Sequence, residues 1–437
     1  MKSIKVVLLG LGTVGKGLYE TINTHQQKLH EATGLPVEIV GILVKDADKP
    51  REIKGNITIT TSVEDLLALQ EVDIVFEAIV GIEPANTYIK RFIEKGSHVI
   101  SANKELLAHK GKELSEYASL HHRFLTFEAA VAGGIPLLRT IIQLLQVNGI
   151  LKVEAILNGT SNYILSKMRK EKANFDDVLK EAQELGYAEA DPSNDVLGTD
   201  AFYKLMILSN LIYQEQPSWE DAVKIGVNQV STSDLLLGEK LGLRLKLLAT
   251  LQMHNEEITA EVKPTFVGAE HPLYNVEGVN NGIVITTDLV GTILLQGPGA
   301  GSKATASAMI EDLVYIRQQE KPKTEHSRSS YHTQNQHDGA PTSVWLAVIE
   351  ETTSKALKNN YSISSKLDKF NTKLLQRDVV KNETGYVIAS LLQGKEENVL
   401  NYLQTLKQEK LRFYPVSTTG FSIQSHEHTP NLLQTTI

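Results

Sequence analysis

A glycine-rich turn follows the first apolar run of the chain and constrains the fold more than any other feature. Residues 4–9 have the pattern of a buried strand, residues 10–15 read Gly-Leu-Gly-Thr-Val-Gly, and a helical pattern extends from residue 14 to about residue 33. In such a unit the three glycines allow a tight turn, a close approach of backbone to pyrophosphate, and close packing of helix on strand. The sequence therefore predicts a dinucleotide-binding turn; the alternative is a tight turn in a fold that binds no nucleotide. The predicted cofactor contacts in this turn are Gly10, Gly12, Thr13, Val14 and Gly15.

The N-terminal third alternates short apolar runs with amphipathic ones. Strands are predicted at residues 37–44, 72–77, 98–101 and 124–127, and helices at 63–69 and 84–95. Strands that alternate with helices form βαβ units and a parallel sheet, so we expect a Rossmann-type α/β domain over residues 1–130. A helix at about 302–319 is expected to complete this domain.

Residues 131–319 predict an α+β domain for substrate binding and dimerisation, because longer helices are mixed with β-rich runs. Helices are predicted at residues 136–146, 163–169, 175–185, 200–213, 219–226 and 233–241. Strands are predicted at residues 152–157, 244–253, 258–266, 282–288 and 292–296.

Polar residues 320–340 predict a linker, and residues 341–437 predict a third, smaller unit. Its strands are expected at residues 344–350, 363–370, 386–392 and 413–416, and its helices at 353–360 and 396–407. The order βαββαβ is that of a ferredoxin-like fold.

The chain of 437 residues contains no cysteine. Disulfides, cysteine zinc sites, iron–sulfur clusters and thiol nucleophiles are therefore excluded. The 44 Lys and Arg against 52 Asp and Glu leave a net charge of −8, which does not favour a nucleic-acid surface. The N-terminus lacks the pattern of a signal peptide, and no apolar run approaches the ~20 residues of a membrane span, so we expect a cytoplasmic protein without membrane contact.

A lysine follows the second predicted strand, where NAD-selective domains usually have an acidic residue. This residue is Lys45, and Lys49 and Arg51 stand nearby. A positive charge at this strand end favours the 2′-phosphate of NADP. We therefore predict NADP use, or at least its acceptance beside NAD, with Lys45 as the contact; the alternative is an exposed lysine with no such role.

Asp200 and Lys204 are four residues apart and share one face of a predicted helix. The helix around them is apolar nearly all round, so we expect it to be buried. A buried lysine is costly unless it is paired or functional, and burial lowers its pKa toward the range useful for proton transfer. The pair is therefore a candidate for acid–base chemistry.

Four further segments resemble, in the same order, motifs of the homoserine dehydrogenase family. They are Ala-Asn-Lys at 102–104, Glu-Ala-x-Val-x-Gly-Gly-Ile-Pro at 128–136, Asn-Gly-Thr-x-Asn at 158–162, and the run 182–204 with Asp-Pro-x-x-Asp at its centre. The resemblance covers roughly residues 4–320. It implies the interconversion of L-aspartate 4-semialdehyde and L-homoserine with NAD(P), in threonine and methionine synthesis.

The resemblance also implies roles for the matching residues. Lys204 would be the general acid or base on the substrate hydroxyl, and Lys104 would lie near the nicotinamide and the reacting oxygen; Lys104 could instead be only a cofactor-binding charge. Glu189 would accept from the substrate ammonium, and Asp200 from its polar end. Other implied contacts are Thr160 and Asp195 for the substrate, and Gly186 and Gly301 for the cofactor.

The resemblance implies three further properties. Backbone oxygens around Glu128, Val131, Gly133 and Ile135 match a loop that holds a monovalent cation, Na⁺ or K⁺, and the alternative for this loop is a plain turn. A homodimer or homotetramer is implied through the central sheet. The C-terminal unit resembles a regulatory ACT domain, although the Asp-x-Pro-Gly turn usual in such domains is absent, and it could serve only in oligomer contacts.

Other functional classes share some of these features. Aspartate-semialdehyde dehydrogenases and relatives of glyceraldehyde-phosphate dehydrogenase share the predicted architecture, but they need a cysteine nucleophile that this chain lacks. Another cysteine-free oxidoreductase, acting on a different amino or hydroxy acid, remains open. A dinucleotide sensor without turnover has no need of a proton-transfer lysine, so the Asp200–Lys204 pair argues against that class.

Overall fold

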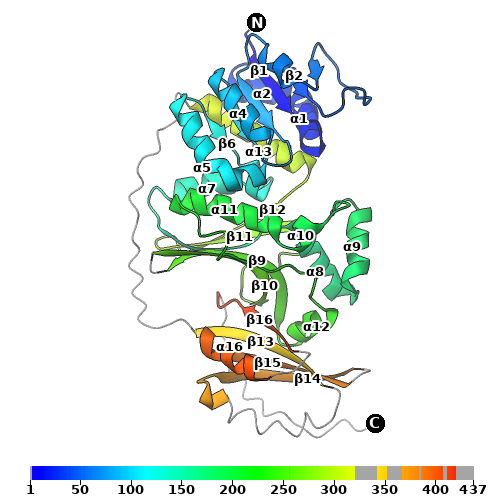
Figure 1. Ribbon diagram of the computed structural model, residues 1–437, viewed down its shortest axis with the longest axis vertical. Helices are drawn as coiled ribbons and strands as arrows, with labels where there is room; N and C mark the ends of the chain where they lie inside the picture. The colour runs from blue at the N-terminus through cyan, green and yellow to red at the C-terminus, as the bar shows by residue number, and fades with distance from the viewer. Residues whose placement is uncertain are drawn as a thin grey trace. The chain divides into compact units, whose positions relative to one another are not determined.

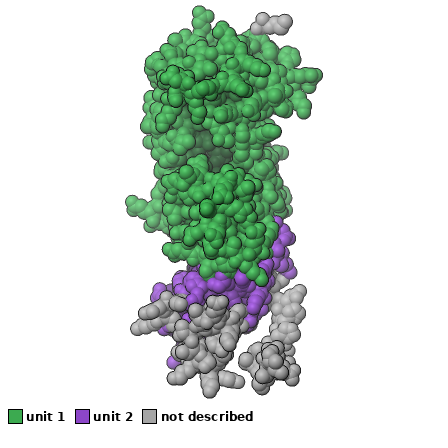
Figure 2. Space-filling view, turned by 90° about the vertical axis from the view of Figure 1, so that its right-hand side faces the viewer, with its two compact units in different colours: residues 1–232, 246–264, 276–338 green, residues 233–245, 265–275, 339–437 purple. Residues whose placement is uncertain are grey.

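The computed structural model describes residues 2–254, 256–319, 342–351, 367–382, 385–406 and 411–419. Two compact units are formed (Figure 2): unit 1 is Met1–Thr232, Lys246–Pro264 and Val276–Asp338, and unit 2 is Ser233–Leu245, Thr265–Asn275 and Gly339–Ile437. Unit 1 therefore contains most of the first two predicted domains. The predicted linker at 320–340 and the predicted helix at 353–360 lie outside the described residues.

The N-terminal part of unit 1 is a parallel six-stranded sheet in the order β3-β2-β1-β4-β5-β6 (Figure 1). This confirms the predicted Rossmann-like α/β fold. Because β1 lies between β2 and β4, the order of the strands reverses there, and ligands of such sheets bind at the carboxyl ends of the strands beside this point. The strands are β1 Ile4–Leu9, β2 Val37–Leu43, β3 Thr58–Thr60, β4 Ile74–Glu77, β5 His98–Ser101 and β6 Leu125–Thr126.

Helices cover this sheet, and one of them comes from far along the chain. The helix α13 (Ser302–Gln318) packs with the first helix of the chain, α1 (Thr13–Thr24), and Figure 1 shows it in yellow among the blue and cyan N-terminal elements. Its residues Met309 and Leu313 share a core with Phe76. The other helices of this part are α2 Gln26–Thr33, α3 Val63–Leu67, α4 Ala85–Glu94 and α5 Lys104–Leu120.

Two of these helices differ from the prediction. The single helix predicted from residue 14 to about residue 33 is two helices, because the chain breaks at His25 between α1 and α2. The helix α5 was not predicted at all. Its buried face includes Ala108, Gly111 and Ala118, and these small side chains hide the apolar periodicity that marks an amphipathic helix.

The rest of unit 1 is built on a second sheet, in which the strands lie in the order β12-β11-β7-β9-β10. They are β7 Ile150–Ile156, β9 Leu243–His254, β10 Glu257–Gly268, β11 Asn280–Thr287 and β12 Thr292–Pro298. The accompanying helices are α6 Ala129–Ala132, α7 Leu137–Leu144, α8 Gly159–Glu171, α9 Phe175–Glu184, α10 Ser193–Val196 and α11 Thr199–Tyr213.

The helix predicted at residues 219–226 is wrong. This segment instead contains a short strand, β8 (Val223–Lys224), which pairs in parallel with Glu261 and Val262 of β10. The close approach of Gly226 to Val196 explains part of the difference, because a Cβ at Gly226 would lie 2.2 Å from the carbonyl oxygen of Val196. Backbone pairing with β10 thus replaces the local helical pattern.

Unit 2 contains four strands in the antiparallel order β16-β13-β15-β14. The predicted strand at 363–370 is wrong in its described part, because residues 367–369 are helical and Leu367 packs in a core with Tyr402 and Leu403. The second strand is instead β14, an edge strand whose charged residues weakened its β signal. The elements are β13 Thr342–Glu351, β14 Lys373–Asn382, β15 Gly385–Lys395, α16 Glu396–Thr405 and β16 Leu411–Val416, with α12 Thr232–Lys240 entering this unit.

None of the helices in the described part of the chain is both long enough and apolar enough to cross a membrane.

The glycine-rich turn offers a matched pair of substitutions. A Cβ at Gly15 would lie 2.1 Å from the carbonyl oxygen of Gly10, whereas a Cβ at Gly12 would meet no heavy atom within 4 Å. We expect Gly15→Ala to destabilise the fold by about 1–3 kcal/mol through overpacking, and Gly12→Ala to change stability by less than about 0.5 kcal/mol. Thermal unfolding of both variants measures the difference. Equal losses of Tm would show that the turn relaxes around the new methyl group.

Candidate active site

The candidate site lies in unit 1, where two helices bring charged side chains together. The helix α5 begins at Lys104, directly after the carboxyl end of β5, and the Asn103 side chain caps it by accepting from the backbone N–H of Leu106. The helix α11 begins after Gly198, which has a φ of +80°. It carries Asp200 in its first turn and Lys204 one turn later.

A single buried carboxylate holds both lysines. Asp200 is 2% exposed; its Oδ2 lies 2.7 Å from Nζ of Lys204, and its Oδ1 pairs with the Lys104 ammonium. Burial alone would raise the pKa of Asp200, but the two neighbouring ammonium groups outweigh burial and hold it well below its usual range. The predicted i, i+4 pair is therefore present, and Lys104 joins it from another helix.

The Lys204 ammonium is held in a low-dielectric position. Its side chain is 8% exposed, and besides Asp200 it donates to the backbone oxygen of Leu157 at 2.7 Å. Burial lowers its pKa; the Asp200 carboxylate opposes this effect, and the like charge of Lys104 adds to it. An ammonium has three protons, so these two hydrogen bonds leave one proton for another acceptor.

Lys104 has a different environment from Lys204. Its side chain is 46% exposed, and the attraction of Asp200 raises its pKa against the effect of burial, with smaller contributions from Asp195 and Glu189. Two lysines beside one carboxylate thus have pKa values shifted in opposite directions. Such a divergence is typical of acid–base sites, where one group stays charged and the other titrates.

Asn158 belongs to this site, although no role for it was predicted from the sequence. Its Nδ2 donates to Oδ1 of Asp195 at 2.7 Å and to Oδ2 of Asp200 at 3.0 Å, while its Oδ1 accepts from the backbone N–H of Ser161. Burial and the neighbouring Asp200 raise the pKa of Asp195. The signal available in the sequence was the N-cap position of Asn158 in the 158–162 motif.

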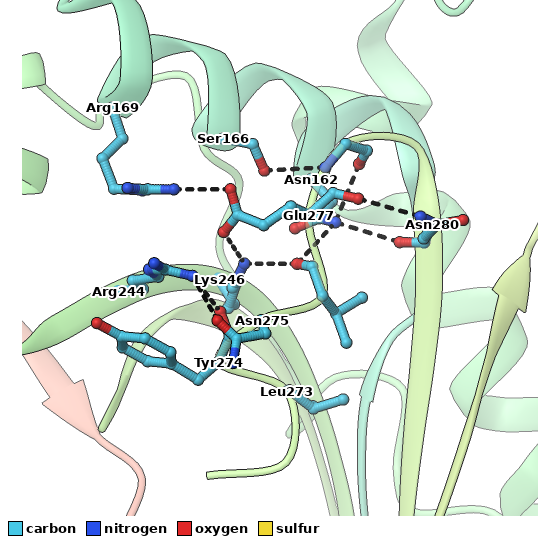
Figure 3. A network of polar contacts seen from close by, with 12 residues as sticks. Asn162, Ser166, Arg169, Arg244, Lys246, Leu273, Tyr274, Asn275, Glu277 and Asn280 are labelled. Atoms are coloured by element: carbon cyan, nitrogen blue, oxygen red, sulfur yellow. Dashed lines mark hydrogen bonds and ion pairs between the residues drawn. The ribbon is translucent and has the colours of Figure 1, made fainter. Parts of the chain in front are cut away.

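The helix α8, which follows Asn158, is anchored by a polar network (Figure 3). Nδ2 of Asn162 donates to the backbone oxygens of Gly278 at 3.0 Å and Asn280 at 3.1 Å. Glu277, which directly precedes Gly278, lies 2.7 Å from the guanidinium of Arg169 and 2.9 Å from the ammonium of Lys246. Burial opposes ionisation, but Lys246 and Arg169 lower the pKa of Glu277 to about 2.

The remaining predicted substrate residues lie around the same helix. The hydroxyl of Thr160 donates to the backbone oxygen of Tyr187 at 2.6 Å, which ties α8 to the loop that carries Gly186 and Glu189. Glu189 is exposed, and its negative charge contributes to the raised pKa of Lys104. Gly186 is also exposed and has a φ of +74°, a conformation that favours glycine.

The predicted cofactor turn is tight at Gly10 and open at Gly12. Gly10 has a φ of +104°, and a Cβ there would lie 2.9 Å from the backbone oxygen of Ala78 at the end of β4. Space is open around Gly12, at the N-terminus of α1. The carbonyl oxygen of Thr13 accepts from the Ser302 hydroxyl at 2.9 Å, so the turn and α13 are linked directly.

Some predicted residues stand apart from the lysine cluster. Among the described residues, no hydrogen bond or ion pair links Lys45, Gly186 or Gly301 to it. Lys45 is exposed just beyond β2, and Gly301 precedes α13 with a φ of +112° and open space around it. Val14 is half-buried at the start of α1.

The predicted cation loop is a buried turn. Gly133 has a φ of +58°, and a Cβ there would lie 2.4 Å from the backbone oxygen of Gly299. Glu128 is buried, and its carboxylate accepts from the backbone N–H groups of Leu138 and Arg139 at 2.7 and 3.0 Å. Val131 and Ile135 are buried as well, and the carbonyl oxygen of Ile135 already accepts from the N–H of Leu137.

Comparison with known proteins identifies one family for the two segments of the chain that carry the site. The model of the homoserine dehydrogenase NAD-binding domain matches residues 10–128, and the model of homoserine dehydrogenase matches residues 136–314. The homoserine dehydrogenase of Bacillus subtilis (strain 168) is 42% identical over 317 residues, which cover 72% of this chain and 73% of that protein.

Solved structures agree with these matches. A homoserine dehydrogenase from Thiobacillus denitrificans aligns with a TM-score of 0.82 at 33% identity and covers 95% of this chain and 98% of its own. A hyperthermophilic archaeal homoserine dehydrogenase in complex with NADPH aligns with a TM-score of 0.61 at 27% identity, over 72% of this chain and 98% of its own. The chain is therefore an oxidoreductase that belongs to the homoserine dehydrogenase family.

Proposed function

We propose that this chain catalyses the reversible reduction of L-aspartate 4-semialdehyde to L-homoserine with NAD(P), in threonine and methionine synthesis, and that Lys204 is its general acid and base. The observation that carries this proposal is the buried Asp200 carboxylate between two lysines of different helices. An alcohol–aldehyde reaction needs one proton at the reacting oxygen, and Lys204 is the group whose pKa is shifted toward proton exchange.

The cofactor would bind at the glycine-rich turn. Gly10, Gly12, Thr13, Val14 and Gly15 would hold its pyrophosphate at the N-terminus of α1, and Gly186 and Gly301 would approach it from other loops. Open space at Gly12 and the positive φ of Gly10 support this fit. When bound, a nicotinamide cofactor supplies or takes up the hydride. The archaeal relative of known structure binds NADPH.

Proton transfer would fall to Lys204. In the direction of reduction, its third ammonium proton goes to the substrate oxygen as negative charge develops there. In the direction of oxidation, the neutral amine takes the hydroxyl proton back. Asp200 and the backbone oxygen of Leu157 hold the nitrogen in place in both directions.

The other polar residues would orient the amino-acid substrate. Lys104 stays charged beside Asp200 and would stabilise the reacting oxygen; its alternative role is a charge that binds the cofactor. The Glu189 carboxylate would accept from the substrate ammonium and Asp200 from the polar end of the substrate. Thr160 and Asp195 would contribute further polar contacts. When both the ammonium group and the aldehyde of the substrate are held, the reacting carbon has one position in the site.

Three further proposals extend this function. The carbonyl oxygens of Glu128, Val131, Gly133 and Ile135 would ligate Na⁺ or K⁺, which the positive φ of Gly133 in this turn supports. The chain would form a homodimer or homotetramer through its central sheet. The strand order β16-β13-β15-β14 supports an ACT-like C-terminal unit, which would serve in regulation or in oligomer contacts.

The central prediction concerns turnover and Lys204. We expect the purified protein to oxidise NADPH when L-aspartate 4-semialdehyde is added, and Lys204→Ala to lower kcat by about 10²- to 10⁴-fold while it keeps cofactor affinity. Lys204→Arg is the matched control, because it keeps the positive charge but cannot give up a proton at ordinary pH. Near-normal kcat in either variant would remove Lys204 from the proposed role. A wild-type protein that binds NADPH without turnover would instead favour the alternative function of a dinucleotide sensor.

Lys104 is expected to shift the pH dependence that Lys204 gives to the reaction. The ammonium of Lys204 is the form needed for reduction, so kcat for reduction should fall as the pH rises through the pKa of Lys204. Lys104→Met removes a like charge that lowers this pKa, so the fall should move to higher pH. Normalised kcat–pH profiles of both proteins measure the shift. A shift to lower pH would contradict the arrangement.

Cofactor selectivity is expected to depend on Lys45. Lys45→Glu places a negative charge where the 2′-phosphate would lie, and we expect it to lower the kcat/KM ratio of NADPH over NADH by about tenfold, which corresponds to a difference of ~1.4 kcal/mol. Lys28→Glu, at an exposed position of α2, is the control for net charge. An unchanged ratio in Lys45→Glu, or a strong NADH preference of the wild type, would exclude this contact.

A further inference from the structure

Another buried carboxylate lies at the carboxyl end of the parallel sheet and has no part in the chemistry proposed above. Glu77 is the last residue of β4, and in the ladder it pairs with Ser101, the last residue of β5. Both side chains have 0% exposure. Among the ion pairs of the described residues none involves Glu77, so its carboxylate is surrounded by neutral donors.

Three donors converge on this carboxylate. Its Oε1 accepts from the backbone N–H of Ile79 at 2.7 Å and, more weakly, from Nδ2 of Asn103 at 3.4 Å. Its Oε2 accepts from the Ser101 hydroxyl, whose oxygen in turn accepts from the backbone N–H of Asn103 at 3.1 Å. Glu77 therefore contacts Asn103 both directly and through Ser101.

Asn103 is the residue that starts α5. Its Oδ1 caps the helix by accepting from the N–H of Leu106 at 3.1 Å, and its Nδ2 also donates to the backbone oxygen of Gly81 at 2.7 Å. The next residue is Lys104, whose ammonium pairs with Asp200. The backbone of Lys104 thus follows directly on a residue that is fixed by its side chain and by its N–H.

We propose that Glu77, acting through Ser101 and Asn103, is a positioning residue that holds Lys104 against Asp200. The same carboxylate holds the turn after β4, where Ala78 lies against Gly10 of the glycine-rich turn. One buried group therefore connects the start of α5 with the wall of the proposed cofactor site. This inference rests on the proposed function of Lys104.

The energetics favour positioning over stability as the role of Glu77. A carboxylate buried without a cation is costly, and burial raises the pKa of Glu77 to about 7 in spite of its hydrogen bonds. An apolar residue at this position would avoid the cost of burying a carboxylate, but it would leave the three donors without an acceptor. Only a side chain with acceptor atoms can hold the backbone of Ile79 and the side chains of Ser101 and Asn103 together.

The test compares two serines of one strand. Ser101 lies at the carboxyl end of β5, and Ser97 lies just before its other end; both are buried, and the Ser97 hydroxyl donates to the backbone oxygen of Val72 at 2.7 Å. Ser101→Ala and Ser97→Ala each remove one buried hydroxyl, so their effects on Tm should be similar. Glu77→Ala would leave buried donors without an acceptor and endanger folding, so the milder Ser101→Ala carries the test.

We expect Ser101→Ala to lower kcat for NADPH oxidation by about 10- to 100-fold and to move the kcat–pH profile to higher pH, as in Lys104→Met. Ser97→Ala should do neither. In a Lys104→Met background, Ser101→Ala should cause no further loss of kcat, because residues that act through one another are not additive. Equal kcat in the two serine variants, or the full loss in the Lys104→Met background, overturns the proposal.

Crystal structures of the two serine variants test the same inference without turnover. We expect the Lys104–Asp200 ion pair to be broken or displaced in Ser101→Ala and intact in Ser97→Ala. An intact pair in both overturns the positioning role even if the chain proves to be a sensor. If the Lys104–Asp200 pair is displaced in Ser101→Ala but the protein does not oxidise NADPH, the positioning role is supported and the proposed function is contradicted.

Discussion

The structure of the site depends on one ionised carboxylate between two ammonium groups. The ammonium groups of Lys104 and Lys204 both pair with Asp200 and would repel each other without it. The Asp200 carboxylate offsets that repulsion and keeps both nitrogens in place. Removal of one member of such a buried set leaves an uncompensated charge, which is far more costly than the loss of an exposed pair. The elements that carry the three groups must therefore be held with little freedom.

The fold supplies this rigidity from both directions. The helix α11 is buried and carries Asp200 and Lys204 on one face, while Asn158 at the start of α8 donates to Asp200. The helix α5 begins where a strand of the parallel sheet ends, so Lys104 stands at the edge of the sheet where ligands bind. The glycine-rich turn follows β1 at the same edge, beside the point where the strand order reverses between β1 and β4.

Local patterns were reliable where neighbours in the sequence decide the structure. The strand–turn–helix of the glycine-rich turn and the apolar helix around Asp200 and Lys204 are written in short-range spacing, and both were predicted. Local patterns failed where packing decides. The buried face of α5 consists partly of small side chains, and Val223–Lys224 pair with β10 where a helix was predicted. The strand predicted at 363–370 lies instead at β14, because Leu367 belongs to a core with α16.

By itself, the sequence determined the parallel α/β domain with its glycine-rich turn, the absence of any thiol chemistry, and the Asp200–Lys204 pair, because each of these depends on residue type and on spacing within a few turns of chain. Only the tertiary structure decided that Lys104 reaches Asp200 from another helix, that Asn158 joins two carboxylates, and that Glu77 and Ser101 lie behind the start of α5. The physical reason is that these contacts join segments far apart in the chain. Their geometry follows from how sheet and helices pack, and no local pattern records it.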